Sequence, residues 1–268
     1  MRRLVLHIGM PKTGTSSIQL ALGVPGGHHW LMLLAAEGPV LRDYMRKLRV
    51  DPLNLQIERT RAEKRLEELA SSNTVMSSEF LFGSTSKAFI DRLHTHLSKH
   101  FDTIQVVVYL QDQVDHMPSR VSQRIKSGQS DWNKILKFED PLYEYDKVCE
   151  MWSSQFDLVV RDYGAQSDVV TDFFALAGDK EAPKLPRQNR SLGRKGLEVM
   201  LLVNKCCAPG NETTRRRIVK SLAELDFSDE RFEIPDALKK QIRDRYRDHN
   251  SQLTERWLNG EPLVSRSI

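Results

Sequence analysis

The first twenty residues carry the pattern that most limits the fold of this chain. An apolar run at residues 4–8 ends at Gly9, and residues 15–22 continue at helical spacing after Gly14. The run predicts a buried strand, and the later spacing predicts a helix. A strand, a glycine-containing loop and a helix in this order bring several backbone N–H groups to one helix start, where an anion is favoured. The sequence therefore predicts an anion-binding loop formed by the amides of residues 13–17.

The position of the lysine in this loop distinguishes two chemistries. A Walker A loop, G-x-x-x-x-G-K-[ST], is matched by Gly9, Gly14 and Ser16, but Thr15 stands where the lysine is required and the lysine is Lys12 instead. In a nucleoside triphosphatase the lysine after the second glycine reaches the terminal phosphates, and the next hydroxyl binds Mg²⁺. A lysine inside the loop instead suits the bridging oxygen of a phosphosulfate, where negative charge accumulates as a sulfuryl group leaves. That chemistry requires no metal.

Residues 7–17, His-Ile-Gly-Met-Pro-Lys-Thr-Gly-Thr-Ser-Ser, resemble the 5′-phosphosulfate loop of bacterial sulfotransferases that use 3′-phosphoadenosine 5′-phosphosulfate. The resemblance implies an α/β fold of the P-loop NTPase-like sulfotransferase type and transfer of a sulfuryl group to a hydroxyl or, less favourably, an amine. It implies that Lys12 stabilises the leaving phosphate. The donor-binding residues that it implies in this loop are Pro11, Lys12, Thr13, Gly14, Thr15, Ser16 and Ser17.

The segment 108–120 resembles the second motif of the family, which binds the 3′-phosphate through an arginine and, eight residues later, a serine. Ser119 matches the serine, but Gln111 stands at the arginine position. An arginine offers a charge-assisted bidentate contact, whereas a glutamine offers one neutral amide donor. The loss of this charge is expected to cost about 1–2 kcal/mol of donor binding if nothing replaces it.

Several basic residues are candidates for replacing that arginine. Arg120, Arg124 and Lys126 follow on the same predicted helix. Residues 193–196, Gly-Arg-Lys-Gly, resemble the Arg-Lys-Gly contact to the 3′-phosphate in cytosolic sulfotransferases, although in a different register, and short basic strings are common. Residues 189–192 resemble a recurring segment of the bacterial family that precedes its C-terminal helices. The sequence leaves the compensating group open.

The proton acceptor for the attacking group is expected near the end of the strand at 74–79. Glu79 follows two serines there, and a carboxylate at this point can accept a proton from an acceptor hydroxyl within hydrogen-bond reach. Related bacterial proteins often carry a similar Ser-Ser-Glu segment. Glu79 is therefore the candidate base, and its alternative reading is a carboxylate that interacts with a helix start. His28 and His29, which follow two glycines, are the next candidates.

Strands alternate with helices over the first two thirds of the chain. Strands are expected at residues 74–79, 103–110 and 157–161, and helices at 55–70, 87–100, 114–126, 143–155 and 169–177. This alternation predicts an α/β fold with a parallel sheet that is flanked by helices and binds its ligand at the carboxyl ends of the strands. Beyond residue 178 the expected helices are 192–205, 213–225 and 235–257. The whole chain, 1–268, is expected to form one domain, with an α/β core at 1–178 and a mostly helical part at 179–268.

Composition narrows the class of protein. Of the 268 residues, 40% are hydrophobic and 28% charged, and no stretch approaches the roughly 20 apolar residues of a membrane span. Three cysteines without metal-ligand or disulfide spacing favour a reducing compartment, and no signal peptide is recognised, so a cytoplasmic location is expected. The net charge of +4, with few aromatics among the basic clusters, favours a multiply anionic small molecule over a nucleic acid. The expected acceptor is a small molecule, a saccharide or a lipid, and no metal is expected.

Two other functions remain open. A P-loop kinase or nucleoside triphosphatase would use ATP and Mg²⁺, with Asp112 as the metal-binding aspartate, but Thr15 counts against it. A catalytically silent nucleotide-binding homologue would keep the fold without the 3′-phosphate arginine. Gln111 is the residue that favours this second alternative.

Overall fold

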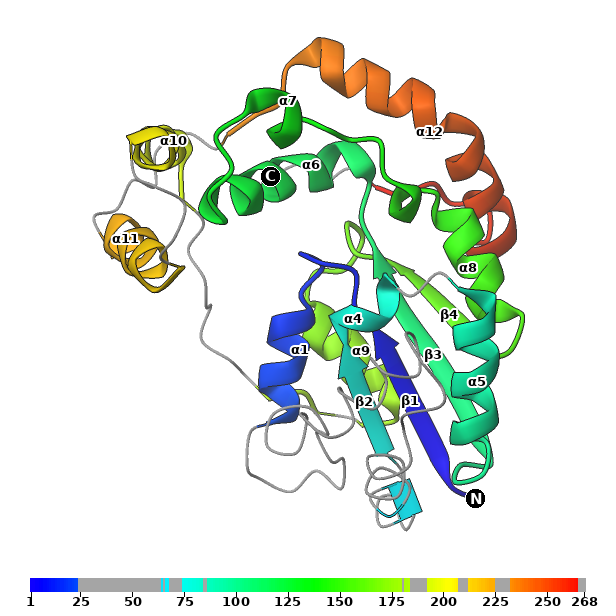
Figure 1. Ribbon diagram of the computed structural model, residues 1–268. Coiled ribbons are helices and arrows are strands. Elements are labelled where there is room, and N and C mark those ends of the chain that lie inside the picture. Colours follow the sequence, from blue (N-terminus) through cyan, green and yellow to red (C-terminus); the bar gives the residue numbers. More distant parts are fainter. Residues whose placement is uncertain are drawn as a thin grey trace. The chain divides into compact units, whose positions relative to one another are not determined.

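The computed structural model describes residues 1–23, 64, 66–67, 74–83, 86–179, 181–183, 192–206, 212–224 and 232–264. Figure 1 shows the arrangement of the elements, whose labels are used below. The expected helix at 55–70, His28, His29 and residues 189–191 fall outside or largely outside these ranges.

The described part of the chain contains a four-stranded parallel sheet with the strand order β2-β1-β3-β4. The strands are β1 (Arg3–Ile8), β2 (Thr74–Ser78), β3 (Thr103–Leu110) and β4 (Asp157–Asp162). In register, Leu6 of β1 lies opposite Met76 of β2 and Val106 of β3. The carboxyl ends of β1, β2 and β3 therefore meet at one edge of the sheet, as the alternating pattern predicts.

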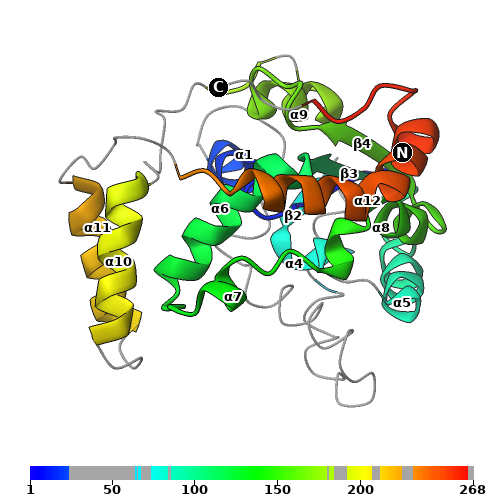
Figure 2. The same ribbon diagram turned by 90° about the horizontal axis from the view of Figure 1, so that it is seen from above.

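Helices cover both faces of this sheet. One face packs against α1 (Thr15–Leu22) and α9 (Val169–Ala177), and its core includes Val5, Tyr109, Ile18 and Phe173. Alternate strand residues point to the other face, where α5 (Lys87–Leu97) and α8 (Tyr145–Ser153) lie in Figures 1 and 2. An apolar face on each side is the arrangement expected for buried parallel strands.

The described chain divides into two units that interleave in sequence. The first comprises residues 1–111, 144–185 and 248–268 and contains the sheet, and the second comprises 112–143 and 186–247. The division therefore does not follow one cut near residue 178. Residues 112–143 belong with the later helices, and the last part of the chain returns to the sheet-containing unit. The expectation of a single domain stays a prediction.

The described elements of the second unit are helical. They are α6 (Gln113–Lys126), α7 (Trp132–Ile135), the 3₁₀ turn η1 (Pro141–Tyr143), α10 (Arg194–Cys206), α11 (Glu212–Glu224) and the first part of α12 (Asp236–Trp257). Asn204 of α10 donates to the Ile125 carbonyl of α6 over 2.7 Å. The Tyr246 hydroxyl of α12 donates to the Phe138 carbonyl over 2.9 Å. These bonds join segments that lie far apart in the sequence.

The elements match the sequence expectations closely where periodicity is strong. The predicted strand at 103–110 and the predicted helix at 169–177 agree with β3 and α9 at both ends. Glu79 differs, because the strand ends at Ser78 and Glu79 begins the short helix α4 (Glu79–Phe82). The helices α4 and α7 were not expected, since four residues are too few for a helical period to be recognised.

None of the helices in the described residues is both long enough and apolar enough to cross a lipid bilayer.

Candidate functional site

The loop between β1 and α1 lies at the carboxyl edge of the sheet and is braced from within. The Thr13 amide and the Thr13 hydroxyl both donate to the Met10 carbonyl, over 3.4 and 2.9 Å, and the Thr15 hydroxyl reaches the same oxygen over 3.4 Å. Both threonines are buried, whereas Ser16 and Ser17 are exposed. The hydroxyl groups of the two threonines therefore stabilise the loop from inside, whereas the two serines face solvent.

Two glycines make the loop's path possible. A Cβ at Gly9 would lie 2.3 Å from the Thr15 hydroxyl oxygen, which is far inside van der Waals contact. Gly14 has φ 82°, in the left-handed region that favours glycine, and a Cβ there would lie 2.6 Å from a methyl carbon of Val169. The tight approach at Gly9 and the left-handed turn at Gly14 both require residues without side chains.

The start of α1 has backbone donors without acceptors. The carbonyl of Gly14 accepts from the amides of Ser17 and Ile18, but within the described residues no acceptor lies at the amides of Gly14, Thr15 or Ser16. The helix carries no acidic residue in its first turn. Unsatisfied N–H groups and the positive end of the helix dipole make this position favourable for an anion.

The open start of α1 contrasts with other helices of the chain. At the starts of α6, α7 and α9 the side chains of Asp112, Asp131 and Asp168 accept hydrogen bonds from backbone amides. Those carboxylates satisfy the N-terminal donors that a helix leaves unpaired. At α1 the capping position is Gly14, which has no side chain to do so. The donors of α1 are therefore available to an external group.

Lys12 and Glu79 are brought close enough for their charges to interact. Lys12 is exposed within the loop and has φ 71°, a left-handed conformation that is uncommon for a residue with a side chain. Glu79 is exposed as a whole residue, but protein atoms around its carboxyl group raise the pKa by desolvation, and the positive charge of Lys12 partly offsets this rise. The structure thus places the two sequence-predicted catalytic residues beside the same loop.

A buried hydrogen-bonded group fixes the strands beneath the loop. His7 of β1 is fully buried, and its Nδ1 lies 2.8 Å from the hydroxyl oxygen of Ser77. The side-chain amide of Gln19 on α1 donates to both the hydroxyl oxygen and the carbonyl of Ser77, each over 3.3 Å. The Gly9 amide donates to the neighbouring Ser78 carbonyl over 3.1 Å. These bonds join β1, β2 and α1 immediately before Glu79.

Burial keeps the His7 imidazole neutral. Desolvation lowers its pKa from 6.5 to about 3, and the ring packs against Phe173 and Tyr109. Neither His7 nor Gln19 was assigned a role from the sequence, because nothing in a single apolar run shows that its histidine contacts a serine seventy residues later. Their contribution is to hold the loop and the end of β2 together.

Gln111 and Ser119 lie in different units of the chain. Gln111 directly follows β3 in the first unit, and its carbonyl accepts from the Tyr145 hydroxyl over 3.0 Å. Ser119 lies on α6 in the second unit, where its hydroxyl donates to the His116 carbonyl over 2.9 Å. The Ser119 hydroxyl proton is therefore used within its own helix.

Two of the candidate compensating arginines already have partners. The Arg120 guanidinium forms an ion pair with Asp140 at 2.5 Å and lies over the Tyr143 ring at 5.2 Å. Arg124 donates to the carbonyls of Ile135 and Lys137 over 2.7 and 2.6 Å. Both side chains therefore support the structure of the second unit. Lys126 also has an interaction partner.

Two further residues considered in the sequence analysis, Asp112 and Arg194, already have hydrogen-bond or ion-pair partners. Asp112 accepts from the amides of Val114 and Asp115 over 2.8 and 3.3 Å, so it caps α6. Arg194 begins α10 and pairs with Glu198 over 3.2 Å. Among the described residues, no three His, Cys, Asp or Glu side chains come together in a group that could hold a metal ion.

The described site therefore combines an open helix start, one lysine and one carboxylate at the carboxyl edge of a parallel sheet. Tyr163 and Val169 were not predicted, yet both lie against Gly14 and limit the space beside the loop. Comparisons of the chain with protein-family models, with curated proteins and with solved structures found no match.

Proposed function

We propose that this protein transfers a sulfuryl group from 3′-phosphoadenosine 5′-phosphosulfate to a hydroxyl or an amine of an acceptor. The observation that carries the proposal is the position of Lys12. It lies in the same loop as the amides of Gly14, Thr15 and Ser16, for which the described residues offer no acceptor. Desolvation raises the pKa of the Glu79 carboxyl group, and the positive charge of Lys12 partly offsets this rise. A cation within such a loop suits a leaving phosphate, and a nearby carboxylate suits proton removal from the attacking group.

The residues suit the 5′ end of this donor. Three amides at the start of α1 would bind the phosphosulfate oxygens, with the exposed hydroxyls of Ser16 and Ser17 beside them. Gly9 and Gly14 let the loop pack closely against Thr15 and Val169, which holds the backbone path that presents these amides. Lys12 would neutralise the negative charge that forms on the bridging oxygen of the leaving phosphate.

In the proposed step the acceptor oxygen attacks sulfur, and the bond from sulfur to the bridging phosphate oxygen breaks. Glu79 would take the proton from the attacking hydroxyl, and desolvation, which raises its pKa, makes this carboxylate a stronger base. The products are the sulfated acceptor and adenosine 3′,5′-bisphosphate. Positioning and electrostatic stabilisation supply most of the catalysis, as they do in phosphoryl transfer.

The acceptor is proposed to be a small molecule, a saccharide or a lipid, and the location cytoplasmic. Cys149 and Cys206 are free thiols, which suits a reducing compartment. The acceptor class is not narrowed by the residues of the loop, because they contact only the donor.

Thermal unfolding of the full chain tests the donor class. Adenosine 3′,5′-bisphosphate at about 100 times its dissociation constant is expected to raise the free energy of unfolding by about 2.7 kcal/mol. Lys12→Met should lose most of this stabilisation, while Lys99→Met, at an exposed position after α5, should keep it. Stabilisation by ATP with Mg²⁺ and not by the bisphosphate would contradict the proposal and favour a kinase or triphosphatase.

A catalytically silent nucleotide-binding homologue is the second candidate, and the engaged arginines favour it. Gln111 is neutral, and both Arg120 and Arg124 are held within the second unit. If the bisphosphate binds but labelled sulfate is transferred to none of a panel of phenols, saccharides and lipids, this second function is preferred.

Gln111→Arg tests the 3′ end of the donor site. A guanidinium at this position should tighten bisphosphate binding by at least about tenfold, since a hydrogen bond to a charged group is worth about 1.5–3 kcal/mol. Gln123→Arg adds the same charge at an exposed position of α6 and serves as the control. Equal affinities of both variants and the wild type, measured by calorimetry, would show that the 3′-phosphate is bound elsewhere.

A further inference from the structure

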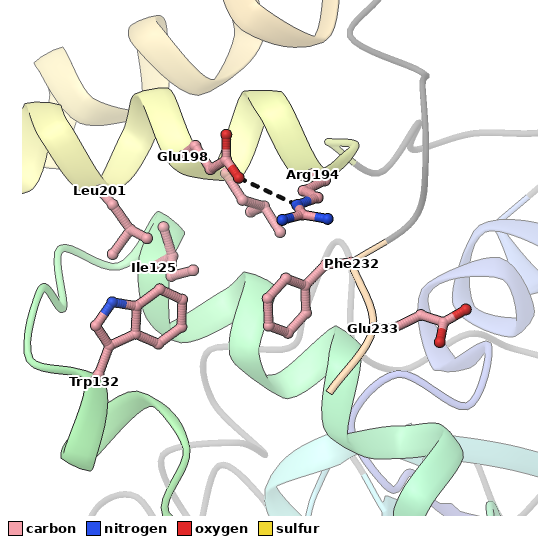
Figure 3. Close-up of a pocket in the computed structure, with 8 residues that line it drawn as sticks. Ile125, Trp132, Arg194, Glu198, Leu201, Phe232 and Glu233 are labelled. Atoms are coloured by element: carbon pink, nitrogen blue, oxygen red, sulfur yellow. Dashed lines mark hydrogen bonds and ion pairs between the residues drawn. The ribbon is translucent and has the colours of Figure 1, made fainter. Parts of the chain in front are cut away.

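The second unit contains a cavity that the proposed transfer does not use. It has a volume of about 650 Å³ and is formed by α6, α7, α10 and the segment that precedes α12. Figure 3 shows its lining residues. This volume is in the range of sites that bind small organic ligands.

Two aromatic side chains form one wall of this cavity. The rings of Trp132 and Phe232 are nearly parallel, with 18° between their planes and 6.4 Å between their centroids. Figure 3 shows the two rings one beside the other with their faces turned the same way. Trp132 is 42% exposed, which is unusual for so large an apolar side chain. The pair therefore offers a flat apolar surface rather than a slot between two rings.

Apolar and charged groups complete the lining. Ile125, Leu197 and Leu201 are buried and line the cavity as well. Arg194 and Glu198 lie along the α10 side of the cavity as an ion pair at 3.2 Å, and both side chains are more than half exposed. They present hydrogen-bond donors and acceptors close to the aromatic surface.

The lining carries three charged side chains, Arg194, Glu198 and Glu233. Arg194 pairs with Glu198 over 3.2 Å, and Glu233 adds a second negative charge. Lys239, which does not line the cavity, lies 3.4 Å from Glu233 and 3.0 Å from Asp236. The lining therefore has a net charge of −1 and gives no advantage to an anionic ligand. A neutral ligand with an apolar face and with hydroxyl groups along its edge fits this combination.

We propose that this cavity binds a neutral oligosaccharide with equatorial linkages. The C–H face of a pyranose ring packs on an aromatic face, and two rings side by side match two successive sugars of an extended chain. Sugar hydroxyls both donate and accept, so they can bond to the Arg194 guanidinium and the Glu198 carboxylate. A flat aromatic ligand would cover the rings but would form no hydrogen bonds to these polar groups. The sugar site lies in the second unit alone and does not depend on sulfuryl transfer.

Calorimetric titration of the full chain with cellotriose and with chitotriose tests the inference. At least one of them should bind saturably. Trp132→Ala and Phe232→Ala should each weaken that binding by about tenfold, the loss of one central aromatic contact. Trp257→Ala, which removes a tryptophan at the end of α12, should leave it unchanged. Circular dichroism checks that each variant is folded.

Three results would overturn the inference. The first is the absence of saturable binding of either trisaccharide to the wild type. The second is binding that Trp132→Ala and Phe232→Ala leave unchanged, because the sugar would then lie elsewhere. The third is saturable binding of 2-naphthol at Trp132 without binding of either sugar, which would identify a cavity for flat aromatic compounds.

Discussion

Gly14 has a left-handed backbone, and the space beside it is filled by Val169. An alanine at this position incurs two costs: about 1–2 kcal/mol for the left-handed conformation and about 1–3 kcal/mol for overpacking. Gly260 has nearly the same φ, 84°, but no atom lies within 4 Å of the place that a Cβ would occupy there. We therefore expect Gly14→Ala to lower the free energy of unfolding more than Gly260→Ala, as measured in urea.

The overpacking at Gly14 can be separated from the backbone strain. Adding Val169→Ala to Gly14→Ala removes the methyl group that the new Cβ would meet at 2.6 Å. The double variant should then be more stable than the sum of the two single changes predicts. Strict additivity would mean that the loop moves away from α9 and that the contact is not the cause.

His7 makes stability depend on pH. The folded chain keeps its imidazole neutral, with a pKa of about 3, whereas the unfolded chain binds a proton below the ordinary value of 6.5. Between these two pKa values the unfolded chain therefore binds more protons than the folded chain. The free energy of unfolding consequently decreases as the pH falls through this range. The expected loss of folding stability is about 1.4 kcal/mol for each pH unit below 6.5.

The His7→Gln variant isolates this contribution. When the pH is lowered from 7 to 5, the free energy of unfolding should decrease in both proteins. The decrease in the variant should be about 2 kcal/mol smaller than the decrease in the wild type. Urea titrations at both pH values measure the difference. An identical decrease in the two proteins would show that His7 is protonated, or reaches solvent, in the folded chain.

At the scale of elements, the helices α6, α7 and α9 begin with an aspartate cap that α1 lacks. Asp168 accepts from the Val170 amide over 3.0 Å and from the Thr171 hydroxyl over 2.6 Å. Asp168→Ala should therefore lower the free energy of unfolding by about 1 kcal/mol, and Asp168→Asn should retain most of the stability, because asparagine also caps well. Thermal unfolding of the three proteins measures the effect, and equal losses in both variants would assign it to charge rather than to capping.

The elements that could be predicted from the sequence are those with a strong local signal. The β-branched run at 103–110 and the helix that ends at Gly178 were placed at both ends, because apolar periodicity and a glycine stop act within a few residues. Glu79 was placed on a strand but begins α4, since three polar residues in a row carry no period. Such boundaries depend on tertiary contacts, here the hydrogen bond from Gly9 to Ser78.

Part of the candidate site could also be predicted from the sequence. The loop, Lys12 and Glu79 lie together because consecutive parallel strands bring their carboxyl ends to one edge. The pairing of Arg120 with Asp140 and the bonds of Arg124 could not be predicted, because a sequence gives no side-chain directions. Nor does it reveal that residues 112–143 belong with the later helices, which depends on contacts between distant segments.

At the scale of the whole molecule, the excess of basic over acidic residues predicts that the proposed binding of the bisphosphate depends on salt concentration. The chain carries a net charge of +4, and adenosine 3′,5′-bisphosphate is multiply anionic. Raising the ionic strength from about 0.01 M to about 0.15 M shortens the screening length from about 30 Å to about 8 Å. Bisphosphate affinity should therefore fall across this range, mainly through slower association.

Whichever of cellotriose and chitotriose binds provides the neutral comparison for this measurement. Its affinity should stay constant over the same range of salt, because it carries no charge. Calorimetry at three or more salt concentrations measures both ligands on the same protein. A salt-independent bisphosphate affinity would contradict the assignment of an electrostatic site at the loop.

The left-handed backbone of Lys12 has a consequence for how this sequence can change. A glycine at position 12 would adopt φ 71° without the penalty of about 1–2 kcal/mol that a side chain incurs there. Selection for heat resistance alone would therefore replace the lysine and remove the cation from the loop. At this residue a gain in folding stability would cost the loop its positive charge. Consensus or thermostability design of this chain should therefore keep Lys12.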